Sequence, residues 1–292
     1  MFDLRSAWAK TGLSILAVAI AVTIVLPVAW IGALSLKTGR EVYNQKFLPD
    51  EWVPGNYITA WREFGLGGYF VNSVFVTVVS VLLTIVVALL AAHAFTWLRF
   101  PGSDVVFTLL LLGIMIPPAA LVLPLLIEAR HLGFYNDLFG LSLVYVAFGL
   151  PISILIFRGF FAGIPGELVE SARLDGAREW KILFRVIVPV ARPAVVTVTI
   201  LLFLANWNDF ILALVLLRDA ETYTLPVGIS QFIGQYATPH ELIAAASLIG
   251  SVPVFILYLV LERKFQQGVT AGALKGRADD ASARGRGCRG TP

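Results

Sequence analysis

Long runs without charged residues dominate the chain. Six of these runs approach or exceed the roughly 20 residues that a helix needs to cross about 30 Å of hydrocarbon, and only the fifth contains an internal charge, Asp209. They do not alternate apolar and polar positions as barrel strands do, so membrane-spanning helices are predicted. The first run is too long for a signal-peptide core and is predicted to be retained. The runs are residues 11–36, 64–98 (with an apolar core at about 70–92), 105–127, 138–157, 193–217 and 242–261.

The composition agrees with a membrane protein. Of the 292 residues, 58% are hydrophobic and only 14% are charged, whereas a typical soluble domain carries about 25% charged residues. This balance excludes an ordinary soluble enzyme, a disordered protein and a collagen-like fibre. Placing both termini in the cytoplasm puts 16 of the 22 Lys and Arg residues on the inner side, which predicts an N-in, C-in topology. The net charge of +3 is then explained by this bias, and nucleic-acid binding need not be invoked.

Residues that carry chemistry are scarce. The single cysteine, Cys288, cannot form an intrachain disulfide, and His93, His131 and His240 lack the spacing of metal ligands. The chain contains no phosphate-binding loop of the G-x-x-x-x-G-K-[ST] type and no catalytic grouping of serine, histidine and acid. We therefore expect no catalytic site, no metal and no cofactor held by this chain. Any energy from ATP would have to come through another subunit.

The longest predicted cytoplasmic connection, residues 158–192, has a helix–bend–helix pattern. Pro165 and Gly166 end the preceding helix, and Glu167 and Glu170 are expected in the first turn of a new one, where the helix dipole favours acids. Asp175 and Gly176 indicate a turn. The expected apolar face of the first helix consists of Ile164, Leu168, Ala172 and Leu174, and that of the second consists of Trp180, Leu183, Phe184 and Ile187.

This connection resembles the EAA loop of type-1 ABC importer permeases. The resemblance rests on the string ESARLDGA over residues 170–177, followed by Phe184, Pro189 and Pro193. The family usually has alanine where this chain has Ser171. In the family, the first helix of this loop docks in a cleft of the ATP-hydrolysing subunit. The resemblance therefore implies these ATPase-coupling residues: Glu170, Ser171, Ala172, Asp175, Gly176, Ala177, Phe184 and Pro189.

Two further strings are similar to carbohydrate permeases of the maltose MalG type. They are NWNDFILAL over residues 206–214, followed by YTLPVG over 223–228, and FQQGVTAGALKG over 265–276. The likeness implies an ATPase-facing tail made of Thr270, Ala271, Gly272, Lys275 and Gly276. It also implies a loop that faces an extracytoplasmic binding protein, made of Tyr223, Thr224, Pro226, Gly228 and Gln231. Asn206, Asn208 and Asp209 form a candidate translocation path, since an acid inside a span indicates a functional site by default; the alternative is an interfacial acid that pairs with solvent or a partner chain.

The resemblance implies an all-α membrane protein with the MetI-like fold and six transmembrane helices. The expected division is a first helix with its outer loop (1–69), the MetI-like domain (70–262) with its EAA loop at 164–193, and a cytoplasmic tail (263–292) that is disordered after about residue 276. The implied function is the permease subunit of a sugar importer in the cytoplasmic membrane, which works by alternating access. The implied partners are a second permease, two ATP-binding subunits that hold ATP and magnesium, a sugar-binding protein and membrane lipid.

Three alternatives remain. A type-1 importer for a non-sugar solute shares the EAA loop but does not explain the strings at 206–214 and 265–276. An ion-coupled secondary carrier should place acids or histidines mid-membrane and should contain paired discontinuous helices; only Asp209 fits, and poorly. A membrane-embedded enzyme lacks the residues to carry out chemistry.

Overall fold

The computed structural model describes residues 7–98, 100–233 and 238–260, and the regular elements within these ranges are all helical. This confirms the predicted all-α class. The main helices are α1 (Ala7–Leu34), α2 (Gly55–Arg62), α3 (Leu66–His93), α4 (Ser103–Leu112), α5 (Val122–His131), α6 (Leu138–Phe161), α7 (Gly166–Leu174), α8 (Glu179–Ile182), α9 (Val188–Val190), α10 (Arg192–Trp207), α11 (Ile211–Leu216) and α12 (Leu225–Ser230). A last described helix covers His240–Val260.

Within the described ranges, four helices are long and apolar enough to cross a membrane: Thr11–Leu34, Leu66–Leu98, Leu138–Phe161 and His240–Val260. They match the first, second, fourth and sixth predicted runs. The third run is broken before Pro117 and Pro118, and the fifth is interrupted between Trp207 and Ile211. Two bent pairs, Ser103–Met115 with Pro118–His131 at 92° and Glu179–Val190 with Arg192–Trp207 at 82°, bring the number of spans to six if each pair is one span.

Prolines and polar residues explain the breaks within the third and fifth runs, whereas the 82° bend, between Val190 and Arg192, lies just before the fifth run. Ile116 is extended before Pro117 and Pro118, because a residue that precedes proline is disfavoured in the helical region and proline has no N–H to donate. Further along, α10 ends at Trp207 and α11 begins at Ile211. The predicted span 193–217 is therefore interrupted at Asn208, Asp209 and Phe210.

The chain divides into two compact units. One comprises residues 1–70 and 227–252, and the other comprises residues 71–226 and 253–292. In the first unit, every side chain from residue 11 to residue 31 is exposed, so α1 offers an apolar surface on all sides, as a lipid-facing helix does. The loop after α1 is tied to α2, because the Asn56 amide donates to the backbone oxygens of Ser35 and Lys37 at 2.9 and 2.8 Å.

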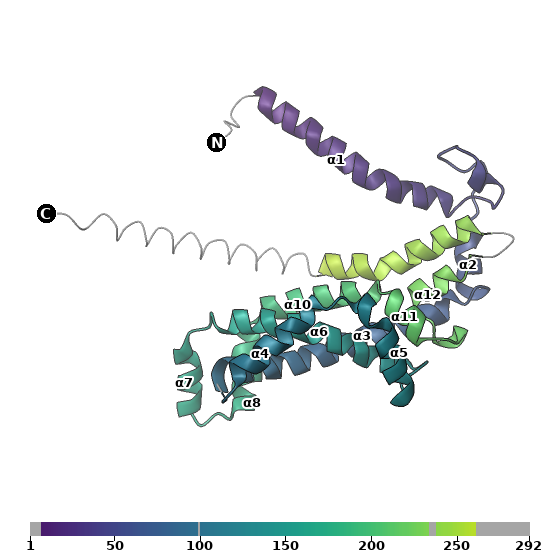
Figure 1. Ribbon diagram of the computed structural model, residues 1–292. Helices are drawn as coiled ribbons and strands as arrows, with labels where there is room; N and C mark the ends of the chain where they lie inside the picture. The colour runs from purple at the N-terminus through teal and green to yellow at the C-terminus, as the bar shows by residue number, and fades with distance from the viewer. Residues whose placement is uncertain (1–6, 99, 234–237, 261–292) are drawn as a thin grey trace. The chain divides into compact units, whose positions relative to one another are not determined.

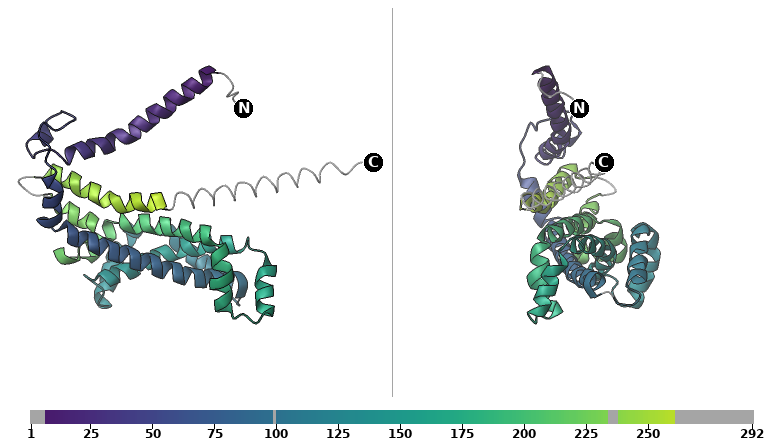
Figure 2. Two further views of the ribbon diagram at one scale, coloured as in Figure 1. Left: turned by 180° about the vertical axis from the view of Figure 1, so that it is seen from behind. Right: turned by 90° about the vertical axis from the view of Figure 1, so that its left-hand side faces the viewer.

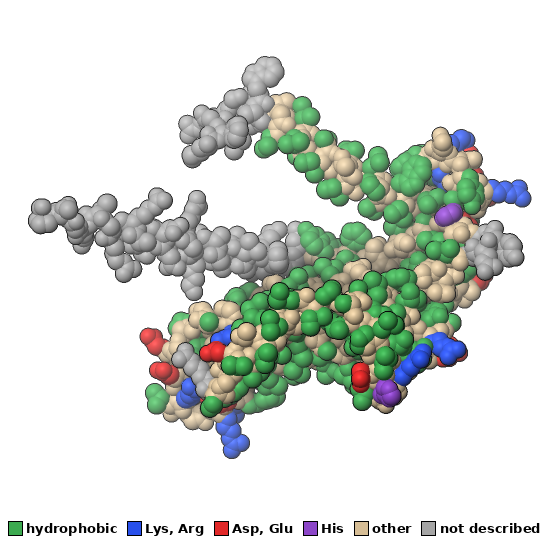
Figure 3. Space-filling model, in the orientation of Figure 1, with side chains coloured by type: hydrophobic (Ala, Val, Ile, Leu, Met, Phe, Trp, Pro, Cys, Tyr) green, Lys and Arg blue, Asp and Glu red, His purple; other side chains and the backbone are tan. Residues whose placement is uncertain are grey.

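The second unit contains the main apolar core. This core joins the end of α3, the end of α6, the start of α10 and the loop between α6 and α10, and fully buried members include Ala88, Phe157, Val169, Ile182 and Ile187. Figure 1 and the reverse view in Figure 2 show α7 and α8 at one end of α3, α6 and α10, with α5 and α11 at the opposite end. In Figure 3, hydrophobic side chains cover the visible side of this unit, and the Lys, Arg, Asp and Glu side chains seen in this view lie toward its two ends.

Candidate functional site

The EAA loop (164–193) has the predicted helix–bend–helix geometry. Helix α7 follows Pro165 and ends at Leu174, Gly176 adopts a positive φ of 77°, and α8 starts at Glu179. The N–H of Gly176 donates to the oxygen of Arg173 at 3.0 Å, and the N–H of Ala177 donates to that of Ala172 at 3.0 Å. These bonds satisfy carbonyls at the end of α7, in the manner of a glycine-terminated helix.

The face of α7 that packs on the protein differs from the predicted one. Val169 is fully buried and Ile164 nearly so, but Leu168 is 44% exposed and Leu174 is 89% exposed. The expected apolar face was therefore wrong at these two leucines. The expected first turn holds Glu167 only, and Glu170 lies beyond it. Because Val169 is the residue of α7 that packs into the core, Leu168 and Leu174 lie on the exposed side of the helix.

The predicted coupling residues divide by exposure. Glu170, Ser171, Asp175 and Gly176 are exposed, and Pro189 is also exposed. Ala172, Ala177 and Phe184 are half-buried and pack against the core, and the ring of Phe184 lies 4.5 Å from that of Trp180. The exposed side of the loop therefore carries acidic, basic and polar side chains together with Leu168, Leu174 and Trp180, and its half-buried residues pack on the core.

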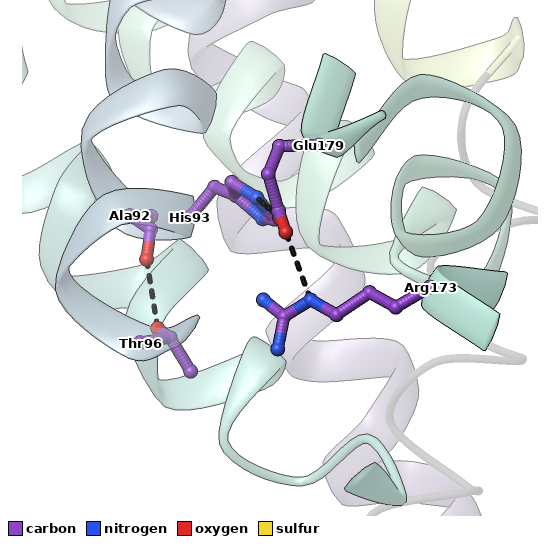
Figure 4. A network of polar contacts seen from close by, with 5 residues as sticks. All are labelled: Ala92, His93, Thr96, Arg173 and Glu179. Atoms are coloured by element: carbon purple, nitrogen blue, oxygen red, sulfur yellow. Dashed lines mark hydrogen bonds and ion pairs between the residues drawn. The ribbon is translucent and has the colours of Figure 1, made fainter. Parts of the chain in front are cut away.

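One carboxylate joins the loop to the end of α3, a contact that no sequence pattern indicates. Glu179 Oε2 lies 2.9 Å from His93 Nε2, and Glu179 Oε1 accepts a hydrogen bond from Arg173 Nε at 2.8 Å (Figure 4). The hydrogen bond from Arg173 lowers the pKa of Glu179, desolvation opposes this, and His93 lowers it further. Because 86 positions separate His93 from Glu179 in the chain, no local spacing could have linked the two residues.

The polar residues of the fifth span are held in different ways. The Asn206 amide donates to Ser80 Oγ at 2.8 Å, whereas the exposed Asn208 donates to the oxygen of Leu204 in its own helix. Asp209 accepts from the Tyr145 hydroxyl at 2.7 Å and from the N–H of Ala213 at 3.1 Å. The structure thus places Asp209 at the helix break, where its carboxylate supports the first turn of α11.

A second unforeseen residue, Asn136, organises the start of the loop at 218–240. Its left-handed backbone, with a φ of 59°, is a conformation that asparagine tolerates better than most residues. Its oxygen accepts from the N–H groups of Arg218 and Asp219 and from Thr222 Oγ1, and its amide donates to the Asp219 carboxylate at 2.7 Å. The amide of Asn72 donates to two further carbonyls in this loop.

The residues predicted to face the binding protein lie at different depths. Thr224 and Gly228 are buried, Tyr223 and Pro226 are half-buried, and Gln231 is exposed. The predicted tail residues, at 270–276, lie outside the described residues. Among the described residues, no group of three or more His, Cys, Asp or Glu side chains could hold a metal ion.

The second unit is therefore a helical bundle with apolar sides, an anchored loop at one end and interrupted helices. The family model described as binding-protein-dependent transport system inner membrane component matches residues 84–267. The chain belongs to this family. The match confirms the resemblance to importer permeases and the predicted location in the inner membrane.

Individual relatives agree over nearly the whole chain. The trehalose transport system permease protein SugB of Mycobacterium tuberculosis is 36% identical over 86% of this chain and 92% of its own length. The diacetylchitobiose uptake system permease protein NgcG of Streptomyces coelicolor is 32% identical over 87% of this chain and 85% of its own length. A crystal structure of a bacterial ABC transporter involved in the import of the acidic polysaccharide alginate aligns with a TM-score of 0.80 at 23% identity, over 91% of this chain and 99% of that chain.

Proposed function

We propose that this chain is one permease of a heterodimeric ABC importer that moves a mono- or oligosaccharide into the cytoplasm. The observation that supports this proposal is that Glu170 and Ser171 on α7, and Asp175 directly after it, are exposed, whereas Val169 of α7 is buried in the core. A docking helix needs this combination, because it must contact a partner and also transmit force to the bundle. The family match supports the assignment, and SugB and NgcG, named for uptake of trehalose and diacetylchitobiose, favour a sugar.

In this proposal the partners supply what the chain does not. Two ATP-binding subunits hold ATP and magnesium and dock on the EAA loops of this permease and of a second permease, and the tail residues 270–276 face the same subunits. Both termini lie in the cytoplasm, and an extracytoplasmic binding protein delivers the sugar to the loop at 218–240. Closure of the ATPases moves α7 and shifts the bundle between inward-open and outward-open states. Asn206, Asn208 and Asp209 contribute to the path.

The proposed sugar import can be tested in proteoliposomes that contain both permeases, both ATPase subunits and the binding protein. We expect ATP-dependent uptake of radiolabelled trehalose or diacetylchitobiose, and no uptake when the ATPase subunits are omitted. The two bent helix pairs are also compatible with an ion-coupled carrier. Uptake that persists without ATPase subunits and follows a proton or sodium gradient would therefore overturn the proposal, and ATP-dependent uptake of a non-sugar solute alone would overturn the assignment to sugars.

Replacing Asn136 by glycine should weaken the response to the binding protein. Glycine keeps the left-handed backbone and removes only the side chain, so the loop from Arg218 to Thr222 loses its hydrogen bonds to Asn136. Each lost bond that leaves a partner unsatisfied costs about 1–3 kcal/mol if it is buried and less if it is exposed. We expect a several-fold fall in the stimulation of ATP hydrolysis by the binding protein, measured in the reconstituted complex.

Basal ATP hydrolysis without the binding protein should stay unchanged in this variant. Asn44→Ala, at an exposed position, is the matched control and should behave as the wild type. Equal stimulation in the Asn136→Gly and wild-type complexes would show that the loop does not depend on this anchor.

A further inference from the structure

A single carboxylate links α7 to α3. Its two oxygens bind groups from different elements, Arg173 on α7 and His93 at the end of α3 (Figure 4). We call His93, Arg173 and Glu179 the loop–helix bridge. The His93 side chain is 6% exposed and that of Glu179 is 39% exposed. The bridge therefore runs from the surface of the loop into the packed end of α3.

The bridge supplies directional hydrogen bonds to a contact between the loop and the core that is otherwise apolar. Val169, Ile182 and Leu183 already attach the loop to the core, but apolar burial is non-directional and fixes no angle between two elements. A hydrogen bond weakens steeply when its geometry departs from the preferred one, and bonds to an ionised group are the stronger kind. A shift of α7 that carries Arg173 with it therefore acts on Glu179, and through Glu179 on His93.

The backbone on both sides of the bridge departs from a regular α-helix. A π-helical turn, Ala94–Leu98, begins directly after His93, and another, Leu183–Ile187, follows the short helix that Glu179 begins. Single π-helical turns inside helices are rare and occur frequently at functional sites. One π-helical turn therefore directly follows α3, which carries His93, and the other directly follows α8, which begins at Glu179.

We propose that the loop–helix bridge is the connection through which movement of α7 reaches the end of α3, with Glu179 and His93 acting as positioning residues for the coupling of ATP hydrolysis to transport. The inference rests on the proposed function, because it requires that α7 bind an ATPase subunit. It assigns a role to two residues outside the string at 170–177. It also predicts that the loss of the bridge uncouples the complex without releasing the ATPase.

The test compares sugar uptake per ATP hydrolysed in the reconstituted complex, with trehalose or diacetylchitobiose as the probe. His93→Ala and Glu179→Ala should each lower this ratio about tenfold, the effect expected for the loss of one hydrogen bond to a charged group. The double variant should be no worse than either single variant, because both break the same contact. His93→Gln should restore most of the ratio, since its amide nitrogen can donate from nearly the position of Nε2.

Thr96→Ala is the matched control. The Thr96 hydroxyl donates to the oxygen of Ala92 at 2.7 Å (Figure 4), so the variant removes a hydrogen bond near His93 without touching the bridge, and its ratio should equal that of the wild type. An unchanged ratio in His93→Ala and Glu179→Ala, additive losses in the double variant, or an equal loss in Thr96→Ala would each overturn the inference. Failure of the proposed function is separate, because it would appear as absence of ATP-dependent uptake in the wild-type complex.

Discussion

Replacing Gly176 by proline should sharply reduce transport while leaving the ATPase sites intact. Proline cannot adopt the φ of 77° found at this position, it removes the N–H that donates to the oxygen of Arg173, and it disfavours the ψ of 3° found at Asp175. A misplaced backbone of this kind costs about 1–3 kcal/mol or more, and each 1.4 kcal/mol is about tenfold in population. We expect uptake by the reconstituted complex to fall by about a hundredfold when these effects combine.

Gly176→Asn separates the conformation of the bend from the identity of the residue. Asparagine tolerates the left-handed region and keeps the N–H donor, so this variant should retain most of the uptake. The affinity of the binding protein for its sugar should be unchanged in both cases, because that site lies on another protein. Uptake by Gly176→Pro at the wild-type rate would mean that the bend after α7 is not needed for coupling.

Replacing Gly228 by alanine should destabilise the unit formed by residues 1–70 and 227–252. The Cβ of an alanine at this position would overlap the ring of Tyr69 at its base, where the side chain has little freedom to move away. Overpacking of this kind typically costs about 1–3 kcal/mol. We expect a lower midpoint of thermal inactivation for the purified complex. We also expect the binding protein to stimulate ATP hydrolysis less, because a displaced α12 would move the adjoining segment that contains Gln231.

Two further variants make this result specific. Gly68→Ala lies next to Tyr69 on α3, where an added Cβ meets nothing within 4 Å, and it should not lower the midpoint. Tyr69→Ala combined with Gly228→Ala should recover part of the loss, since alanine lacks the Cγ and ring atoms that the added Cβ would overlap. A midpoint that is unchanged in Gly228→Ala would show that α12 shifts without strain.

The sequence was sufficient to predict the fold class and the form of the EAA loop. Both follow from local features, namely the length of uncharged runs and a bend at Asp175 and Gly176, and local features survive folding. The predicted face of α7 was less accurate, because the choice between Leu168 and Val169 is made by the core beneath the helix. Which of two neighbouring apolar residues becomes buried cannot be settled by periodicity in a helix of nine residues.

The remaining features depend on contacts between distant segments. The hydrogen bonds of Asn136 reach residues more than 80 positions away, and His93 meets Glu179 across a similar separation. The breaks at Pro117 and at Asn208 had visible signals, prolines in one case and a polar cluster in the other. Those signals mark an irregularity, but they do not say whether the helix kinks slightly or turns by 92°, because neighbouring helices decide how the freed backbone groups are satisfied.

The exposure of α1 determines which amino-acid substitutions this helix can accept. Because the side chains from residue 11 to residue 31 are all exposed, packing inside this chain constrains none of them. Exchanges among leucine, isoleucine, valine and phenylalanine leave the hydropathy of the helix nearly unchanged and create no cavity within the chain. By contrast, fully buried small residues on α3 such as Ala88 and Ala92 have no space to grow. Among the described helices, α1 should therefore tolerate such exchanges better than the end of α3 that packs against the loop.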